Sequence, residues 1–161
     1  MKITYTILLL LVLFTMLTAS ECRKTTTPEF YFKCKVDGQE YIPNSCANCL
    51  AATILEDTTL IMNANRGFET IGFGINESKG IQKGTYFLIN QVGRRATYKK
   101  STTTNDYYRT QSIYPGELTI KEFDKASKII GGTFSFRAYH TLSNDSVIVS
   151  SGEFRLKYKT D

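Results

Sequence analysis

Cysteine is the residue type with the most varied chemistry in this chain. Cys34 stands alone, and Cys46-Ala47-Asn48-Cys49 forms a Cys-x-x-Cys motif further along. Cysteines of exported proteins usually form structural disulfides, because that compartment can be oxidising. We therefore expect a disulfide from Cys34 to Cys46 or Cys49, which would stabilise the fold by about 3 kcal/mol by closing a loop of the unfolded chain.

The same thiols allow two alternatives. A Cys-x-x-Cys at a helix N-terminus is the redox motif of thioredoxin-like proteins. Cys34, Cys46 and Cys49 would also complete a Cys₃His set for tetrahedral zinc with His140, the one histidine of the chain. No βαβ pattern surrounds the motif and no second pair of ligands lies near His140, so the disulfide is the first expectation.

Catalytic motifs are absent from the rest of the sequence. His140 follows a strand-like segment and enters a polar stretch, which is typical of a solvated loop residue. There is no Gly-x-Ser-x-Gly motif, and Gly72-Phe73-Gly74 lacks the following Lys-Ser/Thr of a phosphate-binding loop. We expect a protein that binds and does no chemistry, without a cofactor and, in the first interpretation, without a metal.

A basic and aromatic stretch offers the clearest binding chemistry. Residues 94–112 predict a loop between strand ends, and loops on rigid β scaffolds carry much of the binding function. Cations attract anionic groups and tyrosine rings stack. With a formal net charge of +5, we expect an anionic glycan or another envelope component as partner, and no nucleic acid. The candidate contacts are Arg94, Arg95, Tyr98, Lys99, Lys100, Tyr107, Tyr108 and Arg109.

The N-terminal segment predicts export. A basic residue at position 2 precedes an apolar run over residues 7–14, and the run is too short for a transmembrane helix. We assign residues 1–21 to a signal peptide, Cys22 to lipidation and residues 22–29 to a polar tether. A lipid on Cys22 would anchor the protein in a membrane, and we expect an exported protein that is anchored to the outer membrane or periplasmic. Ordinary cleavage after Ala19 or Ser20 would instead give a soluble secreted protein.

Strands must position these side chains. The length of 161 residues suits one domain, and ten Phe and ten Tyr without any Trp favour strands. Alternation recurs along the chain, as at Ile71, Phe73 and Ile75, and Asp37-Gly38 between strand-like flanks predicts a tight hairpin. We therefore predict one monomeric all-β domain over residues 30–161.

The last third of the chain shows the expected strands most clearly. Residues 117–123 are expected to pair with residues 129–139, and residues 147–149 are expected to turn at Ser151-Gly152 into a final strand over residues 153–158. The spacing predicts an antiparallel meander of about eight to ten strands that forms a β-sandwich, with a small barrel as the alternative.

Several of these segments resemble small uncharacterised envelope lipoproteins of Bacteroidota. The resemblance is carried by residues 32–38 (Phe-Lys-Cys-Lys-Val-Asp-Gly), 116–124 (Gly-Glu-Leu-Thr-Ile-Lys-Glu-Phe-Asp), 132–136 (Gly-Thr-Phe-Ser-Phe) and 152–154 (Gly-Glu-Phe). It covers the chain from about residue 30 onward, in turn and strand patterns. It implies a β-rich exported domain, usually lipid-anchored, and brings no established activity or site residues.

Overall fold

The computed structural model describes residues 29–91, 93–101, 107–140 and 142–161. The predicted signal peptide, Cys22 and the tether up to residue 28 lie outside the described residues. The regular structure of the described residues consists of strands alone, which confirms the all-β prediction. Among these residues there is no helix of the length and hydrophobicity that crossing a membrane would require. The strands are β1 (Tyr31–Val36), β2 (Gln39–Tyr41), β3 (Leu50–Leu55), β4 (Thr59–Arg66), β5 (Glu69–Asn76), β6 (Gly84–Leu88), β7 (Arg94–Lys99), β8 (Tyr107–Arg109), β9 (Gly116–Asp124), β10 (Ile129–His140), β11 (Ser146–Lys157) and β12 (Lys159–Thr160).

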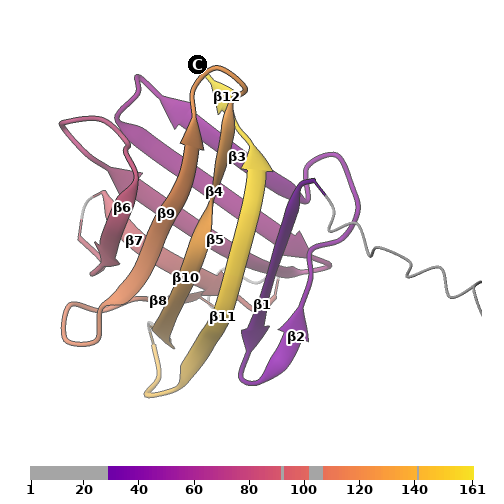
Figure 1. Ribbon diagram of the computed structural model, residues 1–161. Coiled ribbons are helices and arrows are strands. Elements are labelled where there is room, and N and C mark those ends of the chain that lie inside the picture. The colour runs from indigo at the N-terminus through magenta and orange to yellow at the C-terminus, as the bar shows by residue number, and fades with distance from the viewer. Residues whose placement is uncertain (1–28, 92, 102–106, 141) are drawn as a thin grey trace, which may run out of the picture.

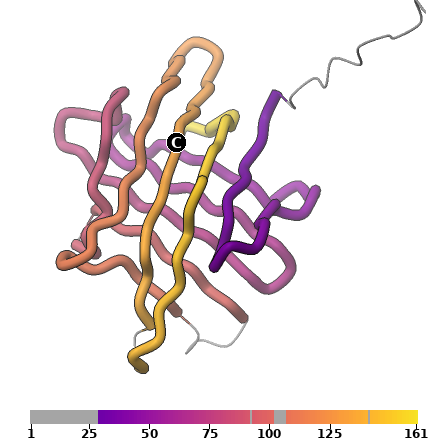
Figure 2. Tube along the Cα trace, turned by 60° about the horizontal axis from the view of Figure 1, so that its bottom comes forward, coloured from indigo at the N-terminus to yellow at the C-terminus, as the bar shows by residue number. Residues whose placement is uncertain are grey.

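These strands form one hydrogen-bonded sheet that folds over into two layers. The order is β12-β3-β4-β5-β7-β8-β10-β11-β1-β2, with β9 beside β10 and β6 beside β9. Figure 1 shows β9, β10, β11 and β1 lying across β3, β4, β5 and β7, and Figure 2 shows the same layers after rotation. The short strand β8 joins the layers because it pairs with both β7 and β10. The predicted layered arrangement is therefore present, with β2 and β12 at the two ends of the sheet order.

The predicted hairpin at Asp37-Gly38 is confirmed. Val36 pairs with Gln39, and Asp37 and Gly38 both have positive φ angles, of 48° and 81°. A two-residue turn of this kind needs positive φ at both central positions, which Asp and Gly tolerate better than other residues. The turn therefore sets the register of β1 and β2.

The expected pairing of β9 with β10 is present, but the expected turn at Ser151-Gly152 is wrong. β11 runs through both residues without a break. Ser151 has a φ of 52°, and the register of β10 against β11 shifts between Phe134 and Phe136. An extra residue of this kind is a β-bulge, which bends a strand without ending it.

The core lies between the two layers. Phe73 on β5 packs edge-on against Phe134 and Phe136 on β10, with ring centroids 4.9 and 5.8 Å apart. Such edge-to-face aromatic pairs are favourable beyond the area that they bury. The alternation expected in β5 and in the last strand is confirmed, because one face of each is buried. The residues concerned are Ile71, Phe73 and Ile75 on β5 and Phe154 and Leu156 on β11, followed by Tyr158.

Candidate functional site

The expected binding loop is a pair of strands. Residues 94–99 form β7 and residues 107–109 form β8, and Thr97 pairs with Arg109 while Lys99 pairs with Tyr107. The loop prediction for the whole stretch is therefore wrong, although the residues between the two strands include 102–106, which lie outside the description. The physical reason is that alternate residues, Ala96 and Tyr98, are apolar and fit a core face.

Strand alternation divides the predicted contacts into two sets. Tyr98 and Tyr108 point into the core, with 4 % and 5 % of their surface exposed, so neither ring is available to a surface ligand. Their centroids lie 5.9 Å apart. Arg94, at the beginning of β7, binds the Glu77 carboxylate at 2.7 Å. These three residues are structural.

The two buried tyrosines anchor acidic side chains. Tyr98 donates a hydrogen bond of 2.5 Å to Glu69, and burial together with this bond raises the pKa of Tyr98. Tyr108 donates a hydrogen bond of 2.9 Å to Asp145, and this bond lowers the pKa of the Asp145 carboxyl. A hydroxyl whose partner is ionised forms a stronger hydrogen bond, so both tyrosines fix the sheet rather than bind a ligand.

The remaining contacts lie on the outer face of the layer formed by β4, β5, β7 and β8. Arg95, Lys99, Tyr107 and Arg109 alternate with core residues and therefore share this face. Lys100 is exposed directly after β7. The sequence prediction thus placed four of its eight candidates on one surface, although on strands instead of a loop.

A depression lies on the same outer face. It has a volume of about 220 Å³ and is lined by Ile61, Asn63, Gly72, Phe73, Gly74, Arg95, Thr97, Tyr107 and Arg109. We call it the outer-face hollow. One row of the sheet crosses it in register, from Asn63 through Gly72 and Thr97 to Arg109. Because Gly72 and Gly74 have no side chains, the longer side chains around them form walls above a glycine floor.

Charge is concentrated at this hollow. Within the described residues, neither Arg95 nor Arg109 has an acidic partner, whereas Arg66 binds Glu69 at 2.6 Å. The Arg109 guanidinium lies 5.4 Å from the centroid of the Tyr107 ring. Two guanidinium groups that no described acidic residue neutralises, beside the Tyr107 ring, can bind an anion and stack against a flat or cyclic ligand.

The predicted crosslink of Cys34 is wrong. The disulfide joins Cys46 to Cys49, with Cα atoms 5.1 Å apart, and Cys34 is a buried free cysteine. Burial raises the pKa of the Cys34 thiol to about 12, and the nearby positive charge of Arg66 opposes this only in part. Cys34 faces the core between Phe32 and Val36, and the alternation of β1 is the signal that could have shown it.

The alternative zinc set is not brought together, because no group of three or more potential metal ligands occurs in the described part of the chain. Cys46 and Cys49 are bonded to each other, as the two cysteines of an oxidised Cys-x-x-Cys would be, so the redox alternative stays a prediction. His140 packs against the Tyr108 ring with centroids 5.0 Å apart, and its Nδ1 lies 3.0 Å from the Ser143 hydroxyl. The Cys-x-x-Cys lies in a surface loop before β3 rather than at a helix N-terminus.

The sequence interpretation missed the residues that shape the hollow. Asn63, Gly72, Gly74 and Thr97 were not singled out as ligand contacts, because their importance comes from neighbouring strands. Gly72-Phe73-Gly74 was recognised only as part of a strand. Two glycines on the outward face of a strand are the available signal, because they leave a sheet surface without side chains.

These features describe an all-β protein domain made of one folded sheet. It has a cationic hollow on one outer face and a small loop closed by a disulfide. A family model described as a domain of unknown function, DUF6252, matches residues 22–156. The chain belongs to this family. No curated protein and no solved structure matches the chain.

Proposed function

We propose that this protein is a lipid-anchored envelope protein of Bacteroidota that acts by binding an anionic glycan in the outer-face hollow. The observation that carries the binding proposal is the placement of Arg95 and Arg109. Both line a glycine-floored depression, and neither has an acidic partner in the described residues. A guanidinium that no described carboxylate neutralises can bind the carboxylate or sulfate of a ligand.

The lining favours an acidic sugar over other anions. Arginine binds carboxylates through two parallel hydrogen bonds, the Tyr107 ring offers a stacking face, and Asn63 and Thr97 offer polar groups for sugar hydroxyls. The volume of about 220 Å³ lies below the range of about 300–1,000 Å³ of sites that enclose drug-sized ligands. We therefore expect one acidic sugar unit to enter the hollow, with the rest of the polymer lying across the sheet.

The proposed compartment agrees with the cysteine chemistry and the N-terminal sequence. A disulfide such as Cys46–Cys49 is typical of an oxidising, exported compartment. The family match begins at Cys22, the residue that we propose carries the lipid. The resemblance to envelope lipoproteins supports the same anchor.

Binding can be tested by titrating the protein with polygalacturonate, with neutral dextran as the reference polymer. We expect Arg95→Gln/Arg109→Gln to weaken binding of polygalacturonate about tenfold or more, because each bond to a charged group contributes about 1.5–3 kcal/mol. Arg137→Gln/Lys121→Gln is the matched control, since it removes the same charge from exposed residues of β10 and β9. If both double variants lose the same affinity for polygalacturonate, the effect comes from net charge alone. If Arg95→Gln/Arg109→Gln binds as tightly as the unmodified protein, the hollow is not the binding site.

The anchor can be tested separately by the intact mass of the mature protein recovered from membranes. We expect the mass of an acylated chain that begins at Cys22, lowered by two hydrogens for the disulfide. Cys22→Ser should move the protein from the membrane to the soluble fraction. An unacylated mature chain would exclude the anchor and leave the glycan proposal standing.

A further inference from the structure

An apolar depression lies where the folded sheet does not close. On one side are residues 30–32, at the beginning of β1, and on the other are residues 42–47 of the loop between β2 and β3, with Leu50 at the beginning of β3. Its volume is about 520 Å³. We call it the seam groove. Strands β1 and β3 belong to different layers, and no strand in the described residues pairs with both, so side chains alone cover the core here.

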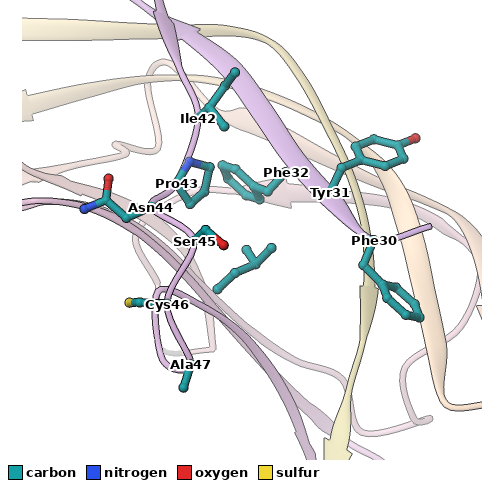
Figure 3. Close-up of a pocket in the computed structure, with 10 residues that line it drawn as sticks. Phe30, Tyr31, Phe32, Ile42, Pro43, Asn44, Ser45, Cys46 and Ala47 are labelled. Carbon is teal, nitrogen blue, oxygen red and sulfur yellow. The ribbon is translucent and has the colours of Figure 1, made fainter. Parts of the chain in front are cut away.

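The lining of the seam groove is mostly apolar, with Asn44 and Ser45 among its polar residues. Figure 3 shows the Phe32 ring pointing across toward Pro43, whereas the side chains of Asn44 and Cys46 point away from the gap. Phe30 is 38 % exposed and Ile42 is 53 % exposed, one on each side of the groove. Aromatic and aliphatic side chains exposed together around an apolar depression indicate a contact surface for an apolar partner.

The charges beside the groove are already neutralised. The Arg155 guanidinium lies 5.8 Å from the centroid of the Phe30 ring and is bound to Glu122 at 2.8 Å. The Lys33 ammonium lies 5.8 Å from the Tyr31 ring and is bound to Glu153 at 3.1 Å. Among the described residues, this rim therefore differs from the outer-face hollow, because its Arg155 and Lys33 side chains are both paired with glutamates. A ligand here would be held by hydrocarbon contact and not by net charge.

The position of the groove along the chain indicates its occupant. Phe30 follows Cys22 by eight residues, and a chain segment of that length spans about 28 Å at most, even when fully extended. A lipid on Cys22 would therefore keep the seam groove next to the bilayer. Aromatic side chains with neighbouring cations are typical of protein surfaces at the membrane interface.

We infer that the seam groove seats the domain on the membrane by taking up hydrocarbon of a membrane lipid between β1 and the disulfide loop. The inference rests on the proposed anchor, because a lipid on Cys22 supplies the proximity. The contact orients the molecule. Figures 1 and 2 show β6 on the side of the molecule away from β1, so a groove facing the membrane keeps β6 away from it.

The absence of tryptophan from the sequence provides a clean test. Phe30→Trp introduces a single tryptophan at the groove, which can be excited apart from the tyrosines, and Phe87→Trp introduces one at an exposed phenylalanine of β6. The full mature protein is reconstituted in phosphatidylcholine vesicles with and without bromine-labelled acyl chains. We expect the emission of the Phe30→Trp protein to shift to the blue and to be quenched by the brominated chains. The Phe87→Trp protein should show neither change.

A second substitution tests the groove itself. Ile42→Gln in the Phe30→Trp protein should reduce the quenching, whereas Ile148→Gln, at an exposed isoleucine of β11, should leave it unchanged. Because the rim charges are paired, the quenching should not depend on salt or on added anionic lipid. Polygalacturonate binding at the outer-face hollow should weaken with salt, so the two sites can be distinguished.

Each remaining outcome overturns the inference. Equal quenching at both positions would mean that the domain lies on the bilayer without orientation. No quenching from an acylated protein would mean that the groove does not meet lipid, while the proposed anchor would stand. A blue shift without vesicles, together with a dimer in sedimentation, would assign the groove to a second copy of the chain. An unacylated mass would overturn the anchor and, with it, the inference that rests on the anchor.

Discussion

Gly152 shows how one residue shapes the layer that contains β9, β10, β11 and β1. It pairs with Phe134 across β10 and β11, directly after the bulge at Ser151. A Cβ at position 152 would overlap the Phe134 ring. The ring therefore occupies the space that a side chain would need, and Phe134 completes the aromatic cluster with Phe32 and Phe73.

We expect Gly152→Ala to lower the free energy of unfolding by about 1–3 kcal/mol, because the added methyl group displaces a packed ring. Denaturant unfolding followed by circular dichroism measures the effect. Gly74→Ala is the control, since a Cβ there meets only the Arg95 side chain, at 3.7 Å. If the two variants are equally stable, the ring is not held against the glycine.

For single residues, the sequence predicts which face of a strand a side chain occupies. It predicts less well which other residues that side chain contacts. Alternation alone would have placed Cys34 and Tyr98 in the core, and both errors came from weighing residue type above strand period. The contacts of Arg95 with its glycine floor were beyond prediction. They depend on which strand lies beside β7, and pairing partners are not encoded in a short segment.

Among the features of secondary structure, turns are the ones that can be predicted most directly from the sequence. The Asp37-Gly38 hairpin was predicted because its backbone angles restrict the residues allowed there. The turn between β9 and β10 has a comparable device in Asp124. Its carboxylate accepts hydrogen bonds from the backbone N–H groups of Ala126, at 2.8 Å, and Ser127, at 3.2 Å. Ser151-Gly152 was mistaken for a turn because a bulge uses the same residue types.

Asp124 makes the stability of this hairpin depend on pH. The hydrogen bond from the Ser127 hydroxyl, followed by those from the backbone of Ser127 and Ala126, lowers the pKa of the Asp124 carboxyl from its ordinary value of 3.8. A carboxyl with a lowered pKa in the folded state stabilises the protein above its ordinary pKa. That contribution is lost as the pH falls through the lower, folded value.

We therefore expect the melting temperature to fall as the pH decreases below about 4, and Asp124→Asn to make that decrease shallower. The amide oxygen of asparagine still accepts the backbone hydrogen bonds but does not titrate in this range. Thermal melts at several pH values measure both slopes. Glu117→Gln, at an exposed residue of β9, is the control. If its slope changes as much as that of Asp124→Asn, the effect is general charge and not the turn.

At the scale of the whole molecule, the order of the strands in the sheet could not be predicted from the sequence. The predicted meander holds for β3, β4 and β5 and for β9, β10 and β11, where neighbours along the chain pair with each other. β1 instead pairs with β11, and β12 runs parallel to β3. These pairings bring strands from the first and last parts of the described chain side by side. They arise from the sum of many weak side-chain contacts across the core.

The C-terminal segment is consequently integral to the whole fold. β11 lies between β10 and β1, and its second half carries Phe154 and Leu156 into the core, followed by Tyr158. We expect a chain that ends at Ser151 to be insoluble or unfolded, because it exposes the edges of both neighbouring strands and loses these apolar side chains. A chain that ends at Tyr158 is the control, since it lacks only β12 and the final residue. Circular dichroism melts compare the two, and a cooperative transition in the chain ending at Ser151 would show that the domain folds without the second half of β11.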